Sequence, residues 1–246
     1  MTAILSCSDV TVAFGAFKAI NGLSLDFDAG KTSAIIGPNG AGKTTLINVL
    51  SGIYRPTAGS VRLEGEDITS LRPDRRTRMG IARSFQIVKI FPEMSARENL
   101  RIAAQRSAYR IQPFWKLAGR DTEIERRIEE MLTLVGLRDL ADREASYLSH
   151  GKQRALELGL TLMGEPKILL LDEPLAGVGH SELGWMTELL QTIRRRHTTI
   201  IIEHNMDAVL SLADEIVVLV AGQVLARGEP SEVTADQKVR EAYLGT

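Results

Sequence analysis

The sequence has little of what a disulfide-bonded or membrane-spanning protein needs. Its 246 residues include one cysteine, Cys7, which excludes an internal disulfide and fits a reducing compartment. The longest strongly apolar stretch runs only from Ile216 to Ala221, whereas a bilayer-spanning helix needs about 20 such residues. No basic segment precedes the apolar residues at the N-terminus, so we expect neither a membrane span nor a targeting signal.

Neither sign of charge is in excess. Thirty Lys and Arg residues stand against 31 Asp and Glu residues, which leaves a formal net charge of −1. This balance argues against a generally basic nucleic-acid coat and against an acidic tail, although it is compatible with a local basic groove. The sequence also has no internal repeat and no low-complexity tract. A length of 246 residues, with 44% of them apolar, fits one large domain or one domain carrying an added lobe.

The first third of the chain has the residue patterns of short strands around one helix. Leu23, Leu25 and Phe27 alternate with polar residues, which is the two-residue period of a half-buried strand. Further on, Ser95 and Glu98 form a capping-box pattern before an apolar-periodic segment, and residues from about 90 to 160 are expected to be largely helical. The other elements expected before residue 90 are strands at Ala34–Ile36 and around Val61 and Leu63, and a helix over Thr44–Ser51.

Strand and helix patterns alternate again in the last third. We therefore predict an α/β core of about residues 1–90 and 160–246, with a helical lobe of about residues 91–159 inserted into it. The elements expected after the lobe are a strand at Ile168–Leu171, a helix over Glu182–Arg196, a strand at Thr198–Ile202 and a hairpin of Ile216–Val220 with Gln223–Ala226.

A glycine-rich segment after Ala34–Ile36 matches the phosphate-binding P-loop pattern of Gly, four residues and Gly-Lys-[Ser/Thr]. Glycines let consecutive backbone N–H groups turn toward one anion, and the following helix directs its positive end to the same place. Lys43 would supply a charge to the β- and γ-phosphates, and Thr44 or Thr45 a hydroxyl to Mg²⁺. The residues expected to bind the nucleotide are Gly37, Pro38, Asn39, Gly40, Ala41, Gly42, Lys43, Thr44 and Thr45.

Two carboxylates follow the expected strand at Ile168–Leu171. Asp172 would orient the Mg²⁺ shell beside the P-loop, because Mg²⁺ prefers one or two carboxylates together with phosphate and water oxygens. Glu173 would orient the attacking water or take its proton. Two more polar residues are candidates: His204, after the strand at Thr198–Ile202, and Gln86, which would accept from metal-bound water. A lone histidine is more often structural, so the residues by themselves leave both of these roles open.

The segment Leu148–Arg154 resembles the Leu-Ser-Gly-Gly-Gln signature of ATP-binding-cassette (ABC) ATPases. Together with the P-loop, Gln86 and His204, this resemblance extends from about Phe14 to the C-terminus. It implies a P-loop NTPase fold with a RecA-like core, an N-terminal antiparallel β-subdomain and an inserted α-helical subdomain. It also implies ATP hydrolysis with Mg²⁺.

The resemblance also implies roles for individual residues. Phe14 would stack on the adenine, with Phe17 as the nearest alternative. Gln86 would join the core to the helical lobe, Glu173 would be the general base and His204 the switch residue. The implied catalytic set is therefore Lys43, Gln86, Glu173 and His204, and the implied metal set is Thr44, Gln86 and Asp172.

In ABC ATPases two cassettes close around two ATP molecules, each held by the P-loop of one chain and the signature of the other. Ser149, His150 and Gly151 are thus implied to bind the nucleotide of a second cassette. The sequence departs from the family pattern at His150 and Lys152, where Gly and Gln are usual. It also has Gly179 where an Asp or Asn usually reaches across the dimer. We therefore expect an asymmetric pair with a non-identical second cassette, with a homodimer as the alternative.

A narrower resemblance is to the ATPase subunits of bacterial importers for branched-chain amino acids and to their relatives for urea and amides. The segment Leu148–Gly151 is slightly more similar to the urea-type relatives. The narrower resemblance implies integral membrane permeases as partners, a periplasmic binding protein acting indirectly, and a place on the cytoplasmic face of the bacterial inner membrane. The segment Ile87–Asn99, with Phe91 and Pro92, is the candidate docking surface, the alternative being a local core contact. The stretches that carry this resemblance are Phe85–Pro92, Glu173–Gly177, Ile202–Met206 and Ala242–Gly245.

Three other functions compete with this one. The ATPase of a lipopolysaccharide-type export complex has a similar C-terminal tail, but the long segment between Pro92 and Leu148 disfavours it. A soluble ABC ATPase acting on nucleic acid usually carries two cassettes or a long coiled coil, and this sequence has neither and no long basic run. A P-loop small-molecule kinase is disfavoured by the signature and by His204. We therefore expect no nucleic-acid partner.

Overall fold

The computed structural model describes residues 3–84, 89–108 and 122–244. The chain divides into two compact units. The core unit comprises Met1–Arg83, Lys167–Pro174 and Leu190–Thr246, and the helical unit comprises Ser84–Pro166 and Leu175–Leu189. Within the described ranges, no helix is both long enough and apolar enough to cross a bilayer.

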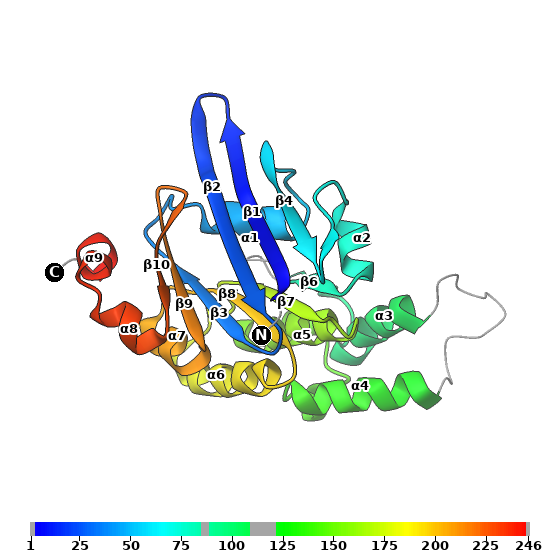
Figure 1. Ribbon diagram of the computed structural model, residues 1–246. Coiled ribbons are helices and arrows are strands. Elements are labelled where there is room, and N and C mark those ends of the chain that lie inside the picture. The colour runs from blue at the N-terminus through cyan, green and yellow to red at the C-terminus, as the bar shows by residue number, and fades with distance from the viewer. Residues whose placement is uncertain (1–2, 85–88, 109–121, 245–246) are drawn as a thin grey trace. The chain divides into compact units, whose positions relative to one another are not determined.

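The core unit contains a four-stranded antiparallel sheet with the strand order β2-β1-β4-β5. Its two long strands, β1 (Ala3–Phe14) and β2 (Phe17–Asp28), form a hairpin that stands out in Figure 1. Strand β4 (Ala58–Leu63) pairs with β1, and the short β5 (Glu66–Asp67) forms the edge. The expected alternation in β2 is confirmed, because Leu23, Leu25 and Phe27 are buried while the intervening residues are exposed.

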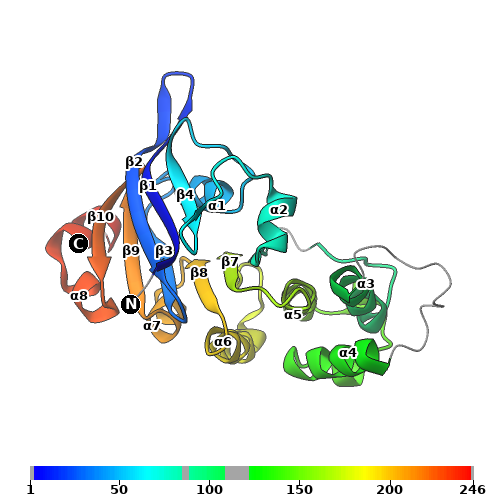
Figure 2. The same ribbon diagram turned by 45° about the vertical axis from the view of Figure 1, so that its right-hand side comes forward.

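The second sheet of the core unit has the strand order β10-β9-β3-β8-β7-β6. Figure 2 labels its strands from β10 to β7. All neighbours pair in parallel except β9 and β10, which form the expected antiparallel hairpin. Residues of β3, β7 and β8 are buried throughout, as in strands covered on both faces. The strands are β3 (Thr32–Ile36), β6 (Ile81–Arg83), β7 (Ile168–Asp172), β8 (Thr198–Ile202), β9 (Glu215–Val220) and β10 (Gln223–Gly228).

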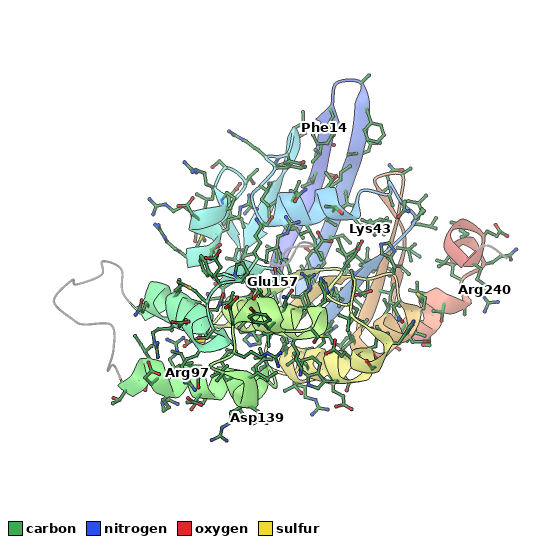
Figure 3. The ribbon with its side chains drawn as sticks, turned by 180° about the vertical axis from the view of Figure 1, so that it is seen from behind. Phe14, Lys43, Arg97, Asp139, Glu157 and Arg240 are labelled. Carbon is green, nitrogen blue, oxygen red and sulfur yellow. The ribbon has the colours of Figure 1, made fainter. Side chains whose placement is uncertain are left out.

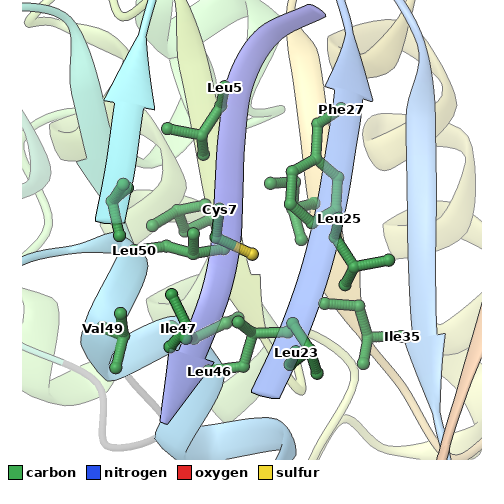
Figure 4. Close-up of a cluster of buried hydrophobic side chains, with 14 of the residues drawn as sticks. Leu5, Cys7, Leu23, Leu25, Phe27, Ile35, Leu46, Ile47, Val49 and Leu50 are labelled. Carbon is green, nitrogen blue, oxygen red and sulfur yellow. The ribbon is translucent and has the colours of Figure 1, made fainter. Parts of the chain in front are cut away.

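Helix α1 (Lys43–Leu50) packs in a hydrophobic cluster that joins the two sheets (Figure 4). Leu46 and Ile47 of α1 belong to it with Leu25 of β2 and Ile35 of β3, and all four are almost completely buried. This cluster fixes the position of the helix that follows the P-loop. Cys7 lies in the same cluster, where burial raises the pKa of its thiol to about 12. It therefore behaves as a small apolar residue.

The remaining helices of the core unit are short. They are α2 (Pro73–Arg78), α7 (Met206–Leu212), α8 (Pro230–Ala235), α9 (Gln237–Val239) and a π-helical turn at Arg240–Leu244.

In the helical unit, α3 (Ala96–Ala108) packs on α4 (Thr122–Leu134) and on α5 (His150–Leu162). Arg97 of α3 forms ion pairs with Glu129 of α4 and with Asp142. The predicted capping box is confirmed, because the Ser95 N–H donates to Glu98 Oε2 over 2.8 Å and the Glu98 N–H donates to Ser95 Oγ. Two 3₁₀ turns, Arg138–Leu140 and Ala145–Tyr147, precede α5, and α6 (His180–Arg194) begins in this unit.

The predicted α/β fold with an antiparallel N-terminal sheet is confirmed. The expected strand at Thr198–Ile202 is reproduced residue for residue. The helix expected over Glu182–Arg196 instead begins at His180 and ends at Arg194. Apolar periodicity locates the buried face of a helix better than its ends, because the terminal residues contribute little to that face.

Candidate functional site

The P-loop residues connect β3 to α1 and are held by the backbones of neighbouring strands. Gly37 has φ +147°, and a Cβ there would lie 2.1 Å from the Leu219 carbonyl oxygen. Gly42 has φ +100°, and its Cβ would lie 2.6 Å from the carbonyl oxygen of Ala19. The Gly222 N–H donates to the Ala41 carbonyl over 3.0 Å, so the β9–β10 turn supports the loop. Glycine at positions 37 and 42 is thus required by close packing as well as by backbone conformation.

Lys43 is the first residue of α1 and is only 6% exposed. Its Nζ donates to the carbonyl oxygens of Gly37 over 2.7 Å and Pro38 over 3.0 Å, so the ammonium lies inside the loop. Burial lowers the pKa of Lys43, and the nearby Glu173 and Asp172 carboxylates partly oppose this shift. The next residue, Thr44, is exposed, whereas Thr45 is half-buried.

A cavity of about 310 Å³ lies against the P-loop. Phe17 and Lys18 of β2 line it together with P-loop residues and Ala221 of the β9–β10 turn. Its P-loop lining consists of Pro38, Asn39, Gly40 and Ala41.

The predicted stacking residue, Phe14, lies on the β1–β2 hairpin, and Figure 3 shows it near the hairpin tip, with Lys43 at the start of α1. Phe14 is 52% exposed and meets Tyr54 edge-on, with the ring centroids 5.7 Å apart. It is the cross-strand partner of Phe17, so both rings are carried by one face of the hairpin. Of the two, Phe17 is the residue that lines the cavity.

Asp172 ends β7 and is 1% exposed. Its Oδ2 accepts from Arg83 Nη2 over 3.1 Å. The same guanidinium donates to Asn48 Oδ1 and to Ser51 Oγ, at the end of α1. Arg83 therefore connects the predicted metal ligand to the helix that carries the P-loop lysine.

Glu173 and His204, two residues of the implied catalytic set, are adjacent in the structure. His204 Nε2 lies 3.0 Å from Glu173 Oε1. Glu173 has φ +49°, an uncommon value for a residue with a side chain, and its N–H donates to the Ile202 carbonyl over 2.9 Å. The buried Glu203 accepts from the His204 N–H through Oε2 and so fixes the turn that presents the histidine.

The signature residues belong to the helical unit. Ser149 is the N-cap of α5, and its Oγ donates to Glu182 Oε1 over 2.7 Å. His150 is exposed, and its ring lies against Gly177, where a Cβ would come 2.9 Å from the ring Cε1. Gly151 is buried beneath the Glu182 carboxylate. The predicted Gln86 lies outside the described residues.

Arg83, Glu203 and Glu182 contact the predicted site residues and were missed in the sequence. The sequence holds a signal for Arg83 and Glu203, because each is a charged residue directly after a run of β-branched or aliphatic residues. Glu182 carries none, because its contact depends on the approach of two helices. Among the described residues, no group of three or more His, Cys, Asp or Glu side chains is arranged to hold a metal ion.

The chain matches two family models. The ABC transporter model covers residues 20–176, and the model of the branched-chain amino acid ATP-binding cassette transporter covers residues 223–246. Among curated proteins, the chain is 40% identical to the high-affinity branched-chain amino acid transport ATP-binding protein BraF of Pseudomonas aeruginosa, over 98% of both chains. It is 36% identical to the corresponding protein LivG of Escherichia coli K12, again over 98% of both chains.

Solved structures agree with this assignment. A nucleotide-free ATP-binding cassette from an ABC transporter superposes with a TM-score of 0.85 at 34% identity and 100% coverage of both chains. The ADP conformation of an ATP-binding cassette of an ABC transporter also superposes with a TM-score of 0.85, at 33% identity and 100% coverage of both chains. The chain belongs to the ABC transporter family and is one of its ATP-binding, ATP-hydrolysing cassettes.

Proposed function

We propose that this chain is the ATP-hydrolysing subunit of a bacterial importer for branched-chain amino acids or related small polar solutes. The full-length similarity to BraF and LivG supports the importer class, and the C-terminal family match points to the same subfamily. The contact between Glu173 and His204 supports the hydrolytic role. The exporter and nucleic-acid alternatives are not favoured, because the full-length relatives BraF and LivG are branched-chain amino acid transport proteins.

In this proposal the P-loop binds the ATP phosphates. Backbone N–H groups of residues 39–45 and the positive end of α1 would face the β- and γ-phosphates. The Lys43 ammonium exchanges its carbonyl contacts with Gly37 and Pro38 for phosphate oxygens. The exchange is favourable because a charge-assisted hydrogen bond to phosphate is stronger than one to a neutral carbonyl.

Glu173 is the proposed general base. Its carboxylate orients the attacking water and takes a proton from it as the γ-phosphoryl group is transferred, which leaves ADP and phosphate. His204 lies close enough to hold the Glu173 side chain in place, and in this proposal it would also contact the γ-phosphate. Glu203 in turn fixes the His204 backbone.

The residues near the P-loop fit a magnesium ion, because they combine a buried carboxylate with an exposed hydroxyl and leave most positions to phosphate and water oxygens. Asp172 and Thr44 would hold it, with Gln86 as the third proposed ligand. When bound, Mg²⁺ neutralises charge on the phosphates during transfer. Arg83 holds the Asp172 carboxylate at the end of β7.

The adenine-stacking residue is tested by two alanine variants. The proposal places Phe14 under the adenine, and the cavity lining makes Phe17 its alternative. Removing the stacking ring should weaken ATP binding about tenfold, because base–aromatic stacking contributes ~1–3 kcal/mol. Titration of Phe14→Ala and Phe17→Ala with a fluorescent ATP analogue identifies the residue. Equal, unchanged affinities in both variants would exclude stacking on this hairpin.

The segment before α3 is the proposed docking surface for a permease. Phe91 is 49% and Met94 38% exposed, so both offer apolar surface. The buried Asn99 side chain supports them: its Oδ1 accepts from the Phe91 N–H, and its Nδ2 donates to the carbonyls of Phe91 and Met94. A loop held this firmly presents its apolar side chains at little entropic cost on binding. The beginning of the segment, residues 87 and 88, lies outside the described ranges.

Replacing Phe91 by Ser should separate docking from nucleotide binding. We expect the Phe91→Ser chain to be recovered with membrane permeases at less than about one fifth of the wild-type yield, because an exposed aromatic anchor contributes ~1–2 kcal/mol. Its affinity for ATP should stay unchanged. Leu225→Ser, which alters a similarly exposed apolar residue on β10, is the matched control. Equal losses in both variants would argue against a specific surface at Phe91.

The proposed assembly contains two cassettes, two permease subunits and a binding protein that delivers the solute. The second cassette is non-identical in this proposal, because Gly179 lacks the side chain that reaches across a symmetric pair. The chain would lie on the cytoplasmic face of the inner membrane. Affinity purification of the tagged chain from detergent-solubilised membranes tests this assembly. Recovery of two permeases and a second cassette supports it, and recovery of the chain alone contradicts it.

A further inference from the structure

A carboxylate from α6 covers the first turn of α5, where the signature residues lie. Glu182 Oε1 accepts from Ser149 Oγ over 2.7 Å. Its other oxygen, Oε2, lies over Gly151, where an added Cβ would approach to 2.6 Å. The first turn of α5 has no acidic residue of its own. Glu182 therefore supplies the negative charge that a helix N-terminus favours.

This contact occupies the one proton that Ser149 has to donate. A serine hydroxyl has a single O–H and otherwise only accepts, and its acceptor side here faces the Lys152 N–H at 3.4 Å. A phosphate oxygen near neutral pH accepts hydrogen bonds. Ser149 therefore cannot donate to Glu182 and to a phosphate at the same time.

The negative charge of Glu182 opposes phosphate binding at the signature, as its hydrogen bond with Ser149 does. A γ-phosphate seated on Ser149 and Gly151 would come close to the carboxylate, and two negative groups at that distance repel each other. Ser149 and His150 are exposed, so a phosphate can approach the signature from solvent. The carboxylate and the phosphate thus compete for one helix N-terminus.

We propose that Glu182 is a competitive gate on the signature: its carboxylate holds Ser149 and the N-terminus of α5 until the γ-phosphate of ATP on a second cassette displaces it. The gate rests on the proposed function, in which the signature binds the nucleotide of a partner. Glu182 sets the ATP concentration at which the two cassettes close, while saturating ATP overcomes it. ADP lacks the γ-phosphate and does not displace the carboxylate.

The test is steady-state ATP hydrolysis, as a function of ATP concentration, by the purified assembly that contains the full-length chain, the second cassette and the permeases. Glu182→Ala should lower the half-saturating concentration about fivefold, because a net hydrogen-bond contribution of ~1 kcal/mol is lost to the competitor. Glu182→Gln keeps an acceptor oxygen but no charge, so its reduction should be smaller, about twofold. The maximal rate should not change. Glu188→Ala, at an exposed carboxylate later in α6, is the matched control and should resemble wild type.

A double mutant separates gating from a general structural effect. In the Ser149→Ala background, Glu182→Ala should leave the half-saturating ATP concentration unchanged, since the gate acts largely through the serine proton. The affinity for ADP should be the same in all variants. The gate is overturned if the half-saturating ATP concentration is unchanged or raised in both Glu182 variants. It is also overturned if Glu182→Ala lowers this concentration as much in the Ser149→Ala background as in the wild-type background. If the melting temperature of Glu182→Ala is well below that of wild type, the half-saturating ATP concentration of Glu182→Gln alone decides whether the gate exists. A wild-type assembly that neither binds nor hydrolyses ATP would instead refute the proposed function itself.

Discussion

Replacing Glu173 by Gln should lower the maximal rate of ATP hydrolysis at least about 100-fold, because a positioned general base contributes ~10²–10⁴ to the rate. The substitution preserves shape and leaves an amide oxygen where Glu173 Oε1 meets His204 Nε2. The affinity for ATP should therefore change by less than about threefold. Single-turnover measurements at saturating ATP isolate this effect from product release.

Two controls make the Glu173 result specific. Glu229→Gln changes an exposed carboxylate of the core unit before α8 and should hydrolyse ATP at the wild-type rate. The melting temperature of Glu173→Gln should match that of wild type, because the residue keeps its backbone bond to Ile202. Near-normal turnover in Glu173→Gln would remove this residue from the role of base.

Replacing Lys43 by Met should weaken ATP binding about 100-fold, because hydrogen bonds from a charged donor to phosphate contribute ~3 kcal/mol. Methionine has nearly the same volume and carries no charge into a position that is 6% exposed. Burial already disfavours the charged form of Lys43, as the lowered pKa shows, so the fold should tolerate this change. Calorimetric titration with ATP measures the affinity, and thermal melting checks the fold.

Lys18→Ala is the matched control for Lys43, because Lys18 lines the cavity against the P-loop and its Nζ donates to Asn21. We expect its ATP affinity to remain within about threefold of wild type, since an exposed ion contact contributes ~0–1 kcal/mol. An equal loss in both variants would indicate a general effect of positive charge near the cavity. Wild-type affinity in Lys43→Met would contradict the P-loop assignment.

Local sequence patterns were sufficient for much of the fold. The strand at Thr198–Ile202 and the β9–β10 hairpin were predictable because β-branched runs and a glycine turn determine them locally. The capping box at Ser95 and Glu98 was predictable for the same reason. In the P-loop, the sequence pattern identified the glycines. The structure shows why glycine is needed at two of these positions: the backbones of Leu219 and Ala19 leave no room for a side chain.

Contacts between distant segments were not predictable. Arg83 and Asp172 are 89 residues apart in the chain, and their ion pair depends on the pairing of β6 with β7. The contact of Ser149 with Glu182 depends on how α5 and α6 pack. The ranking of Phe14 and Phe17 was not predictable either, because both lie beside the β1–β2 turn and only the structure shows that Phe17 lines the cavity. Spacing in the sequence cannot show which distant residues come into contact, since these contacts form only when the chain folds.

The central claim is that ATP hydrolysis by this chain drives solute uptake. The most direct measurement is uptake of radiolabelled leucine into proteoliposomes that contain the permeases, both cassettes and the binding protein, with ATP supplied on the cassette side. We predict ATP-dependent accumulation with the wild-type chain, and an at least about 100-fold slower rate with Glu173→Gln. Uptake at the wild-type rate in the Glu173→Gln vesicles, or ATP-independent uptake with the wild-type chain, would contradict the account.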